Sequence, residues 1–177
     1  MRTILLPLLF LLCSLSAAAQ VDLKLNAGSL LTLGLNGSAE FPLSPRSSLA
    51  LGVARSKLEL TVNNDGYDYR NVRLVPEYRY YFGPRRGQDR WFAGGYGKLI
   101  GLRGRALDNG RQVNATRMAL GIMGGHKWVT NAGFVLELNA GLGGGAVVGS
   151  SDFAFKRAIG TITPVDLRLG ILVGWRL

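Results

Sequence analysis

The stretch Val72–Gly83, "VRLVPEYRYYFG", separates into two kinds of residue when every second position is read. Successive side chains of a β-strand point to opposite faces, so one face of this strand would be wholly apolar or aromatic. The other face would carry Arg73, Glu77 and Arg79. The stretch therefore predicts a strand that separates an apolar environment from a charged one.

The same alternation recurs in four further segments, and no Asp, Glu, Lys or Arg falls on the apolar parity of any of the five. Charged residues make up 18% of the chain, so a random distribution would place several of them at these apolar positions. A water-soluble sandwich or lipocalin also alternates, but it packs its apolar side inside. Alternation alone therefore leaves open which face is outside. The four segments are Leu31–Leu43, Met118–Trp128, Phe134–Leu142 and Val165–Leu177.

The N-terminal region has the features of a secretory signal peptide. A short positive region containing Arg2 precedes the apolar run Ile4–Leu15, which is too short to span a bilayer as a helix. Small residues then offer a cleavage site after Ala19. We therefore expect residues 1–19 to be cleaved and residues 20–177 to form one domain.

Charge and cysteine content narrow the function classes. The formal net charge is +10, which would suit nucleic acid. An exported protein meets little nucleic acid, and the chain has no basic helix or nucleic-acid motif, so lipopolysaccharide phosphates or internal ion pairing are better uses of the charge. The only cysteine, Cys13, lies in the predicted signal peptide. The mature chain then has no disulfide and no thiolate site.

Three features favour a barrel in a membrane over a soluble sandwich. The polar face of the predicted strands combines large charged side chains with glycines, as a narrow lumen requires. Short turns alternate with the longer connections Leu60–Tyr69, Arg103–Gln112 and Val148–Pro164, as in outer-membrane barrels. Aromatic residues gather at the short turns, as in an interfacial girdle. The girdle residues are Phe41, Tyr80, Phe82, Trp91, Trp128, Phe134 and Trp175.

The predicted fold is all-β: a closed antiparallel transmembrane β-barrel of about eight strands. Most of these reach the ~9–11 residues that a tilted membrane strand needs. Gly28 and Ser29 would form a tight external turn. The expected strands are Val21–Ala27, Leu31–Leu43, Ser48–Leu58, Tyr69–Phe82, Arg90–Leu102, Gln112–Val129, Phe134–Val147 and Val165–Leu177.

Three positions disturb the pattern. Arg55 and Lys57 share the parity of apolar residues in their strand, so either the membrane part ends there or a bulge resets the phase. Pro76 cannot donate to a strand ladder, which predicts a bulge or one lost hydrogen bond. The parity of Trp91–Leu102 is not fixed because the segment is rich in glycine.

The charged parity predicts an ion-pair network inside the barrel. Four acids interleave with six bases, which suits mutual neutralisation better than paired acid–base catalysis. The only histidine, His126, has Thr130 as its nearest downstream hydroxyl and is interpreted as an interfacial residue. We expect no catalytic residue, cofactor or metal site. The network residues are Glu40, Arg73, Glu77, Arg79, Arg117, Lys127, Glu137, Asp166, Arg168 and Arg176.

Four stretches carry a resemblance to a known family: "VRLVPEYRYYFG" (72–83), "LNGSAEFPLSPRSSLALGV" (35–53), "NAGFVLELNAGLGGG" (131–145) and "PVDLRLGILVGWRL" (164–177). They resemble a domain-of-unknown-function family of small bacterial outer-membrane β-barrels. The resemblance implies an eight-stranded, OmpA-like barrel in a Gram-negative outer membrane. It brings no established catalytic residues.

These observations lead to one expected function and two alternatives. The first is a monomeric outer-membrane barrel with a structural or surface-interaction role. Its partners would be membrane lipid and lipopolysaccharide, the outer-membrane assembly machinery, and an extracellular ligand bound by the long loops. The alternatives are a narrow anion-selective pore or small-molecule binder, and a lipid-modifying enzyme.

Overall fold

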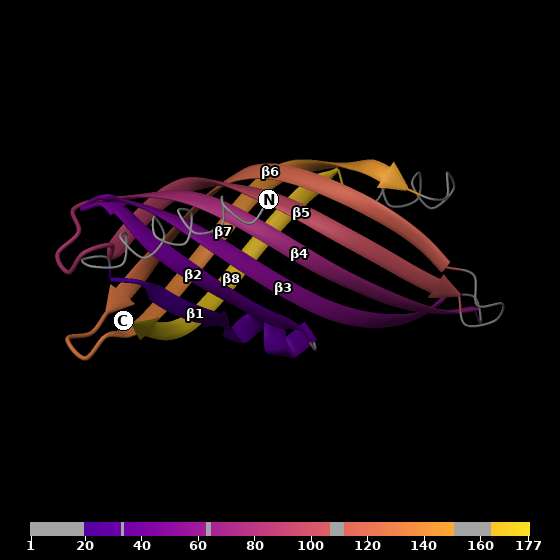
Figure 1. Ribbon diagram of the computed structural model, residues 1–177, viewed down its shortest axis with the longest axis horizontal. Coiled ribbons are helices and arrows are strands. Elements are labelled where there is room, and N and C mark those ends of the chain that lie inside the picture. Colours follow the sequence, from indigo (N-terminus) through magenta and orange to yellow (C-terminus); the bar gives the residue numbers. More distant parts are fainter. Residues whose placement is uncertain (1–19, 33, 63–64, 107–111, 151–163) are drawn as a thin grey trace, which may run out of the picture.

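Eight strands form one closed barrel in the computed structural model, which describes residues 20–32, 34–62, 65–106, 112–150 and 164–177. Each strand pairs antiparallel with its neighbours in the chain, and β1 closes the ring against β8 (Figure 1). The predicted all-β, closed antiparallel barrel is confirmed. The strands are β1 (Asp22–Asn26), β2 (Leu35–Ser44), β3 (Ser47–Val62), β4 (Asp65–Tyr81), β5 (Arg90–Ala106), β6 (Gln112–Val129), β7 (Phe134–Ser150) and β8 (Val165–Arg176).

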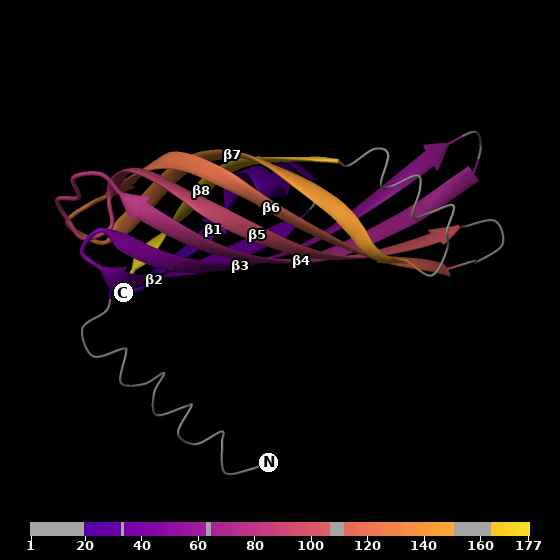
Figure 2. The same cartoon turned by 90° about the horizontal axis from the view of Figure 1, so that it is seen from above.

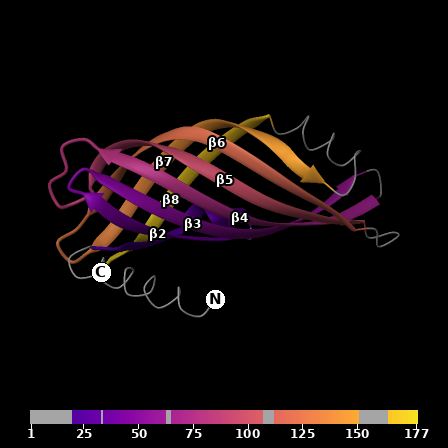
Figure 3. The same cartoon turned by 45° about the horizontal axis from the view of Figure 1, so that its top comes forward.

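The strands run obliquely to the long axis of the barrel, and the short turns lie at the end that carries the C-terminus (Figures 1 and 3). We call this the terminal end and the opposite one the distal end. At the distal end, β3 and β4 extend beyond the barrel wall, away from β5 and β6 (Figure 2). Within the described part of the chain, no helix is long and apolar enough to cross a membrane.

The long polar connection predicted at Leu60–Tyr69 is wrong, because most of it is strand. The ladder between β3 and β4 continues without a shift from Ser47 to Val62. The segment contains the strand-favouring residues Thr61, Val62, Tyr67 and Tyr69, so the ladder extends where polarity alone suggested a loop. Similarly, β5 and β7 run past the predicted strand ends. The rest of those two connections, including Phe153 and Phe155, lies outside the described residues.

The start of the barrel also differs from the prediction. Ala27–Thr32 forms the 3₁₀ segment η2, and β2 begins at Leu35, so there is no tight turn at Gly28-Ser29. The Asn26 side chain accepts a hydrogen bond from the Gly28 amide at 3.0 Å. The Asn26 backbone carbonyl accepts a hydrogen bond from Ser29 Oγ at 2.6 Å. These local hydrogen bonds compete with a strand ladder, which explains why β1 ends at Asn26.

The three disturbed positions are accommodated without a change of phase. Arg55 and Lys57 keep the outward parity of β3 in an unshifted ladder, so no bulge resets the strand there and its apolar stripe ends at Val53. Pro76 stays paired with Leu51 of β3. Pairing of β4 with β5 is interrupted at Val75 and Pro76, with the same register on either side. Proline therefore interrupts the ladder without forming a bulge.

The barrel carries its apolar residues outside and its charges inside. Leu169 is 82% exposed and Leu120 is 75% exposed, both on the outer face. Arg79, Lys127 and Glu137 are 0% exposed inside. A water-soluble barrel has the reverse distribution, whereas an outward apolar band and a polar interior are typical of membrane-spanning barrels.

Candidate functional site in the barrel lumen

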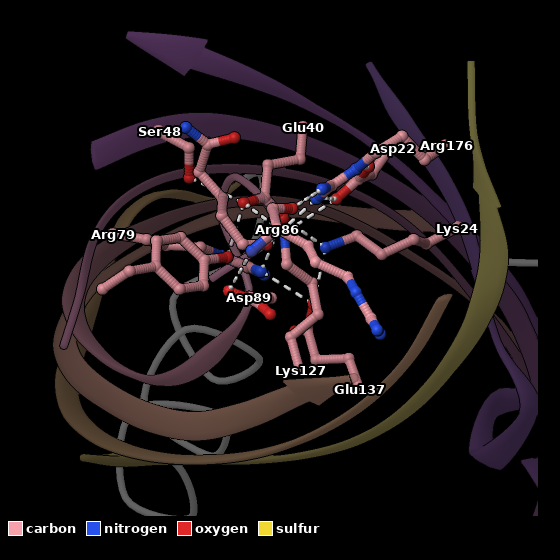
Figure 4. A network of polar contacts seen from close by, with 12 residues as sticks. Asp22, Lys24, Glu40, Ser48, Arg79, Arg86, Asp89, Lys127, Glu137 and Arg176 are labelled. Atoms are coloured by element: carbon pink, nitrogen blue, oxygen red, sulfur yellow. Dashed lines mark hydrogen bonds and ion pairs between the residues drawn. The ribbon is translucent and has the colours of Figure 1, made fainter. Parts of the chain in front are cut away.

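Charged side chains fill the lumen in two layers, which form the candidate site. The terminal layer lies near the C-terminal end of the barrel (Figure 4). The distal layer lies further along the same strands. The terminal layer comprises Asp22, Lys24, Glu40, Glu77, Arg79, Lys127, Glu137 and Arg176, and the distal layer comprises Arg73, Lys98, Arg117, Asp166 and Arg168.

Glu40 is the most highly connected acid of the terminal layer. It points inward from β2, and its two carboxylate oxygens accept from five side chains that come from four different strands. Such a group is stabilised as a charge only while these donors surround it. The donors are Lys24 Nζ (2.5 Å), Arg79 Nη1 (2.9 Å), Lys127 Nζ (2.9 Å), Ser48 Oγ (2.7 Å) and Tyr81 OH (2.5 Å).

Arg79 joins two further acids, Glu77 and Glu137, to Glu40. Its Nη1 also donates to Glu137 at 2.8 Å, while Nε and Nη2 donate to Glu77 at 3.0 and 2.6 Å. Lys24 reaches Glu137 as well, at 2.6 Å. The terminal layer thus holds four acids and four bases, so its formal charge is balanced. Buried charges are tolerated when they are paired and hydrogen-bonded in this way.

A turn closes the terminal end over this layer. Residues 83–89 connect β4 and β5, and they contact three other parts of the rim. Gln88 Nε2 donates to the Ser44 carbonyl at 2.6 Å, and Arg86 Nη1 donates to the Val129 carbonyl at 3.1 Å. Arg176 of β8 donates to the carbonyls of Arg86 and Gln88. Since these partners belong to different sides of the barrel, the turn crosses its mouth (Figure 4).

Arg176 also links this turn to the terminal layer. Its Nε and Nη2 donate to Asp22 at 2.6 and 2.9 Å. Asp22 accepts from Lys127 at 2.7 Å as well. The closing turn and the ion-pair network are therefore one connected structure.

A cluster of buried apolar side chains separates the two layers. It consists of Tyr81, Phe92, Tyr96 and Met123. The Arg79 guanidinium lies over the Phe92 ring at 4.8 Å. On the distal side, the Tyr96 ring faces basic residues of the other layer, and its hydroxyl donates to Asp166 at 2.8 Å. Aromatic faces attract cations, so the cluster stabilises charges on both sides.

The distal layer is not balanced. Asp166 is its only acid among the described residues, and it accepts from Lys98 at 2.7 Å and Arg117 at 3.0 Å. Arg168 instead reaches the Glu77 carboxylate at 2.5 Å, which connects the layers. One acid faces four bases, an excess of three positive charges.

Nine of the ten residues predicted for the network take part in these ion pairs and hydrogen bonds, and Arg73 is the exception. Arg73 Nε is buried and has no hydrogen-bond partner in the described residues, while Glu77 and Asp166 accept from other bases. Sequence reasoning missed Asp22, Lys24, Lys98 and Tyr96. The alternation in "DLKL" (22–25) could have revealed the first two, whereas neighbouring glycines obscured the parity of the others.

The seven aromatic residues predicted for a girdle are all exposed on the outer wall toward the terminal end. Phe134 and Trp175 pack edge to face at 6.2 Å. His126 lies between Trp91 and Trp128, at ring-centroid distances of 4.8 and 4.2 Å. In the described part of the chain, no cluster of three or more His, Cys, Asp or Glu residues could hold a metal.

The fold and the lumen define a class: a small closed barrel of eight antiparallel strands, with an apolar outer wall and buried charges inside. Residues 4–160 match the family described as protein of unknown function (DUF3575), and the chain belongs to this family. The resemblance expected from the four sequence stretches is confirmed.

A solved structure shares this fold. The crystal structure of Neisserial surface protein A matches at a TM-score of 0.52 and 14% identity, covering 90% of this chain and 96% of that chain. At this identity the likeness concerns the fold alone. No curated protein matches the chain.

Proposed function

We propose that the protein is a small outer-membrane barrel with a structural or surface-interaction role and a lumen closed by the terminal layer. The observation that carries the proposal is the distribution of its side chains, with large apolar residues exposed outside and paired charges buried within. Exposing this apolar outer wall to water would cost free energy, whereas contact with lipid hydrocarbon would not. The predicted signal peptide supplies a route of export.

The chemistry of the outer wall suggests an orientation. The aromatic residues near the terminal end fit a bilayer interface, with the short turns and C-terminus on the periplasmic side. Toward the distal end, the exposed residues Lys57, Arg70 and Arg103 are cross-strand neighbours on β3, β4 and β5. This basic row would face lipopolysaccharide phosphates at the cell surface. The distal connections would be the surface available to an extracellular ligand.

We infer a non-enzymatic role, and the surroundings of His126, the residue weighed for catalysis, support it. Its ring packs between two tryptophans on the outer wall, and no contact joins it to a hydroxyl nucleophile or a carboxylate in the described residues. A nucleophile and base must come within hydrogen-bond reach to act together. We infer that His126 is an interfacial residue.

A narrow anion-selective pore is the second candidate, and the positive excess of the distal layer favours it. The terminal layer opposes it, because Lys24, Arg79 and Lys127 are fully buried across the same section of the lumen. An eight-stranded barrel is just wide enough for such side chains to fill. A closed lumen is therefore the better proposal.

Membrane fractionation of a Gram-negative host expressing the full chain tests the location. We expect the mature protein in the outer-membrane fraction, with faster gel migration when it is not boiled. Leu169→Arg should lower the folded fraction, since arginine facing mid-bilayer lipid costs ~2–4 kcal/mol. Leu169→Ala is the matched control and should assemble normally, because Leu169 is 82% exposed. Recovery of wild-type protein from the soluble periplasm without detergent would refute the proposal.

A further inference from the structure

The distal half of the lumen contains a cavity of about 320 Å³. Its walls come from β2, β3, β4, β5 and β8 together with η2. Ligand pockets in proteins start at about this volume, at roughly 300 Å³. The cavity is therefore large enough for a small molecule or for the polar head of a larger one.

Basic side chains from three strands line this cavity: Arg73 of β4, Lys98 of β5 and Arg168 of β8. Glu77 is the only acid among the described lining residues. Three buried polar atoms of the lining have no hydrogen-bond partner within the described chain, namely Arg73 Nε, Arg168 Nη1 and Ser38 Oγ. Buried polar groups are nearly always hydrogen-bonded, so these groups point to an acceptor that the described residues do not provide.

Both oxygens of the two nearby carboxylates already accept from other basic side chains. Glu77 Oε1 accepts from Arg168 and its Oε2 accepts from Arg79. Asp166 Oδ1 accepts from Arg117, and its Oδ2 lies 2.7 Å from Lys98. The described carboxylates thus leave an excess of positive charge in the distal layer, which an anion from outside the chain would balance.

The wall beside the cavity is built differently from the rest of the barrel. β8 pairs with β1 only from Leu172 to Arg176. Closer to the distal end, η2 lies between β8 and β2 (Figure 1). Gly28 and Ser29 of η2 and Leu167–Ile171 of β8 line the cavity together. Across this seam the Ile171 amide donates to Asn26 Oδ1 at 3.4 Å.

From these observations we propose that the distal cavity binds an oxyanion, a phosphate or carboxylate group, between Arg73, Lys98 and Arg168. Guanidinium groups donate in a planar fork that matches such anions, and charge-assisted hydrogen bonds of this kind are strong. The anion neutralises part of the distal excess and supplies acceptors for the unpartnered donors. It arrives either as a free solute or as the head group of a lipid that enters beside η2.

Arg73→Gln and Arg55→Gln provide a matched pair of variants. Arg55 pairs with Val72, the residue before Arg73, but it lies exposed on the outer wall of β3. Both substitutions remove one positive charge at the same height of the barrel. Only Arg73→Gln removes it from the cavity.

The test measures phosphate binding by the detergent-extracted full-length mature protein, using calorimetry and the melting temperature. We expect inorganic phosphate to bind saturably and raise the melting temperature of wild type and Arg55→Gln, beyond the effect of chloride at equal ionic strength. Arg73→Gln should lose affinity by about tenfold or more, as expected for one charge-assisted contact. In phosphate-free buffer it should melt at or above wild type, because it relieves unbalanced charge.

A second arm identifies the source of the anion. Phosphatidic acid in mixed micelles that displaces inorganic phosphate, where phosphatidylcholine does not, would assign the site to a lipid head group. Failure of phosphatidic acid to displace bound phosphate would assign it to a free solute, and either result supports an oxyanion site. The proposal is overturned if phosphate acts on wild type no differently from chloride. It is also overturned if the two Arg→Gln variants bind phosphate equally.

Discussion

The terminal and distal layers are built from the same residue types on shared strands, yet their charges are arranged differently. β4 supplies Glu77 and Arg79 to the terminal layer and Arg73 to the distal layer. In the terminal layer acids match bases in number, and Lys127 is fully buried. In the distal layer bases exceed the single acid, and Arg168 is 14% exposed beside a cavity. The difference indicates that one layer closes and stabilises the barrel, while the other keeps positive charge available.

Removing one acid from each layer should give the largest contrast. Glu40→Gln leaves three terminal bases without their shared carboxylate and should lower the free energy of unfolding by about 3–5 kcal/mol. Asp166→Asn should cost less, about 1–3 kcal/mol, since its partners are partly solvated by the cavity. Urea unfolding in detergent micelles measures both. Equal losses would contradict the distinction between the layers.

Removing one lysine from each layer should separate them further. Lys127→Met leaves Asp22 and Glu40 undercompensated and should lower unfolding free energy by about 3 kcal/mol. Lys98→Met removes one charge from the positive excess and leaves Asp166 paired with Arg117, so it should change the unfolding free energy by less than about 1 kcal/mol. The same unfolding measurement applies. A larger loss for Lys98→Met than for Lys127→Met would reverse our assignment of the balanced layer.

The smallest expected effect is a difference in salt dependence. Raising sodium chloride about tenfold should reduce the loss caused by Asp166→Asn and leave that of Glu40→Gln nearly unchanged, because salt screens buried pairs poorly. Unfolding curves at two salt concentrations provide the comparison. If salt rescued both variants to the same extent, solvent would have equal access to the two layers.

The outer wall and most of the lumen could be predicted from the sequence because parity is a local property of a strand. In Val72–Gly83 and Val165–Leu177 the apolar residues occupy alternate positions and so share one face of the strand. The charged residues therefore lie on the opposite face. The same rule extends through Arg55, whose outward position marks the end of the apolar stripe rather than a change of phase. Burial on one side specifies register strongly, so these assignments did not require tertiary information.

Other features depend on contacts between distant segments. Asp22 and Lys24 do alternate with leucines, but in a strand of only five residues this signal is weaker than in the longer strands. Gly95 and Gly97 flank Tyr96 and leave the parity of β5 undefined until it pairs with β6. The lack of a hydrogen-bond partner for Arg73 Nε in the described residues follows from competition among bases on four strands for two carboxylates. No pattern within one strand contains that information.

Conductance in a planar bilayer tests most directly the claim that the terminal layer closes the lumen. We expect pure wild-type protein to insert without producing stable single-channel steps, because buried ion pairs and the turn at residues 83–89 occupy the terminal end. Stable, anion-selective channels formed by wild-type protein would contradict this claim and establish the pore instead.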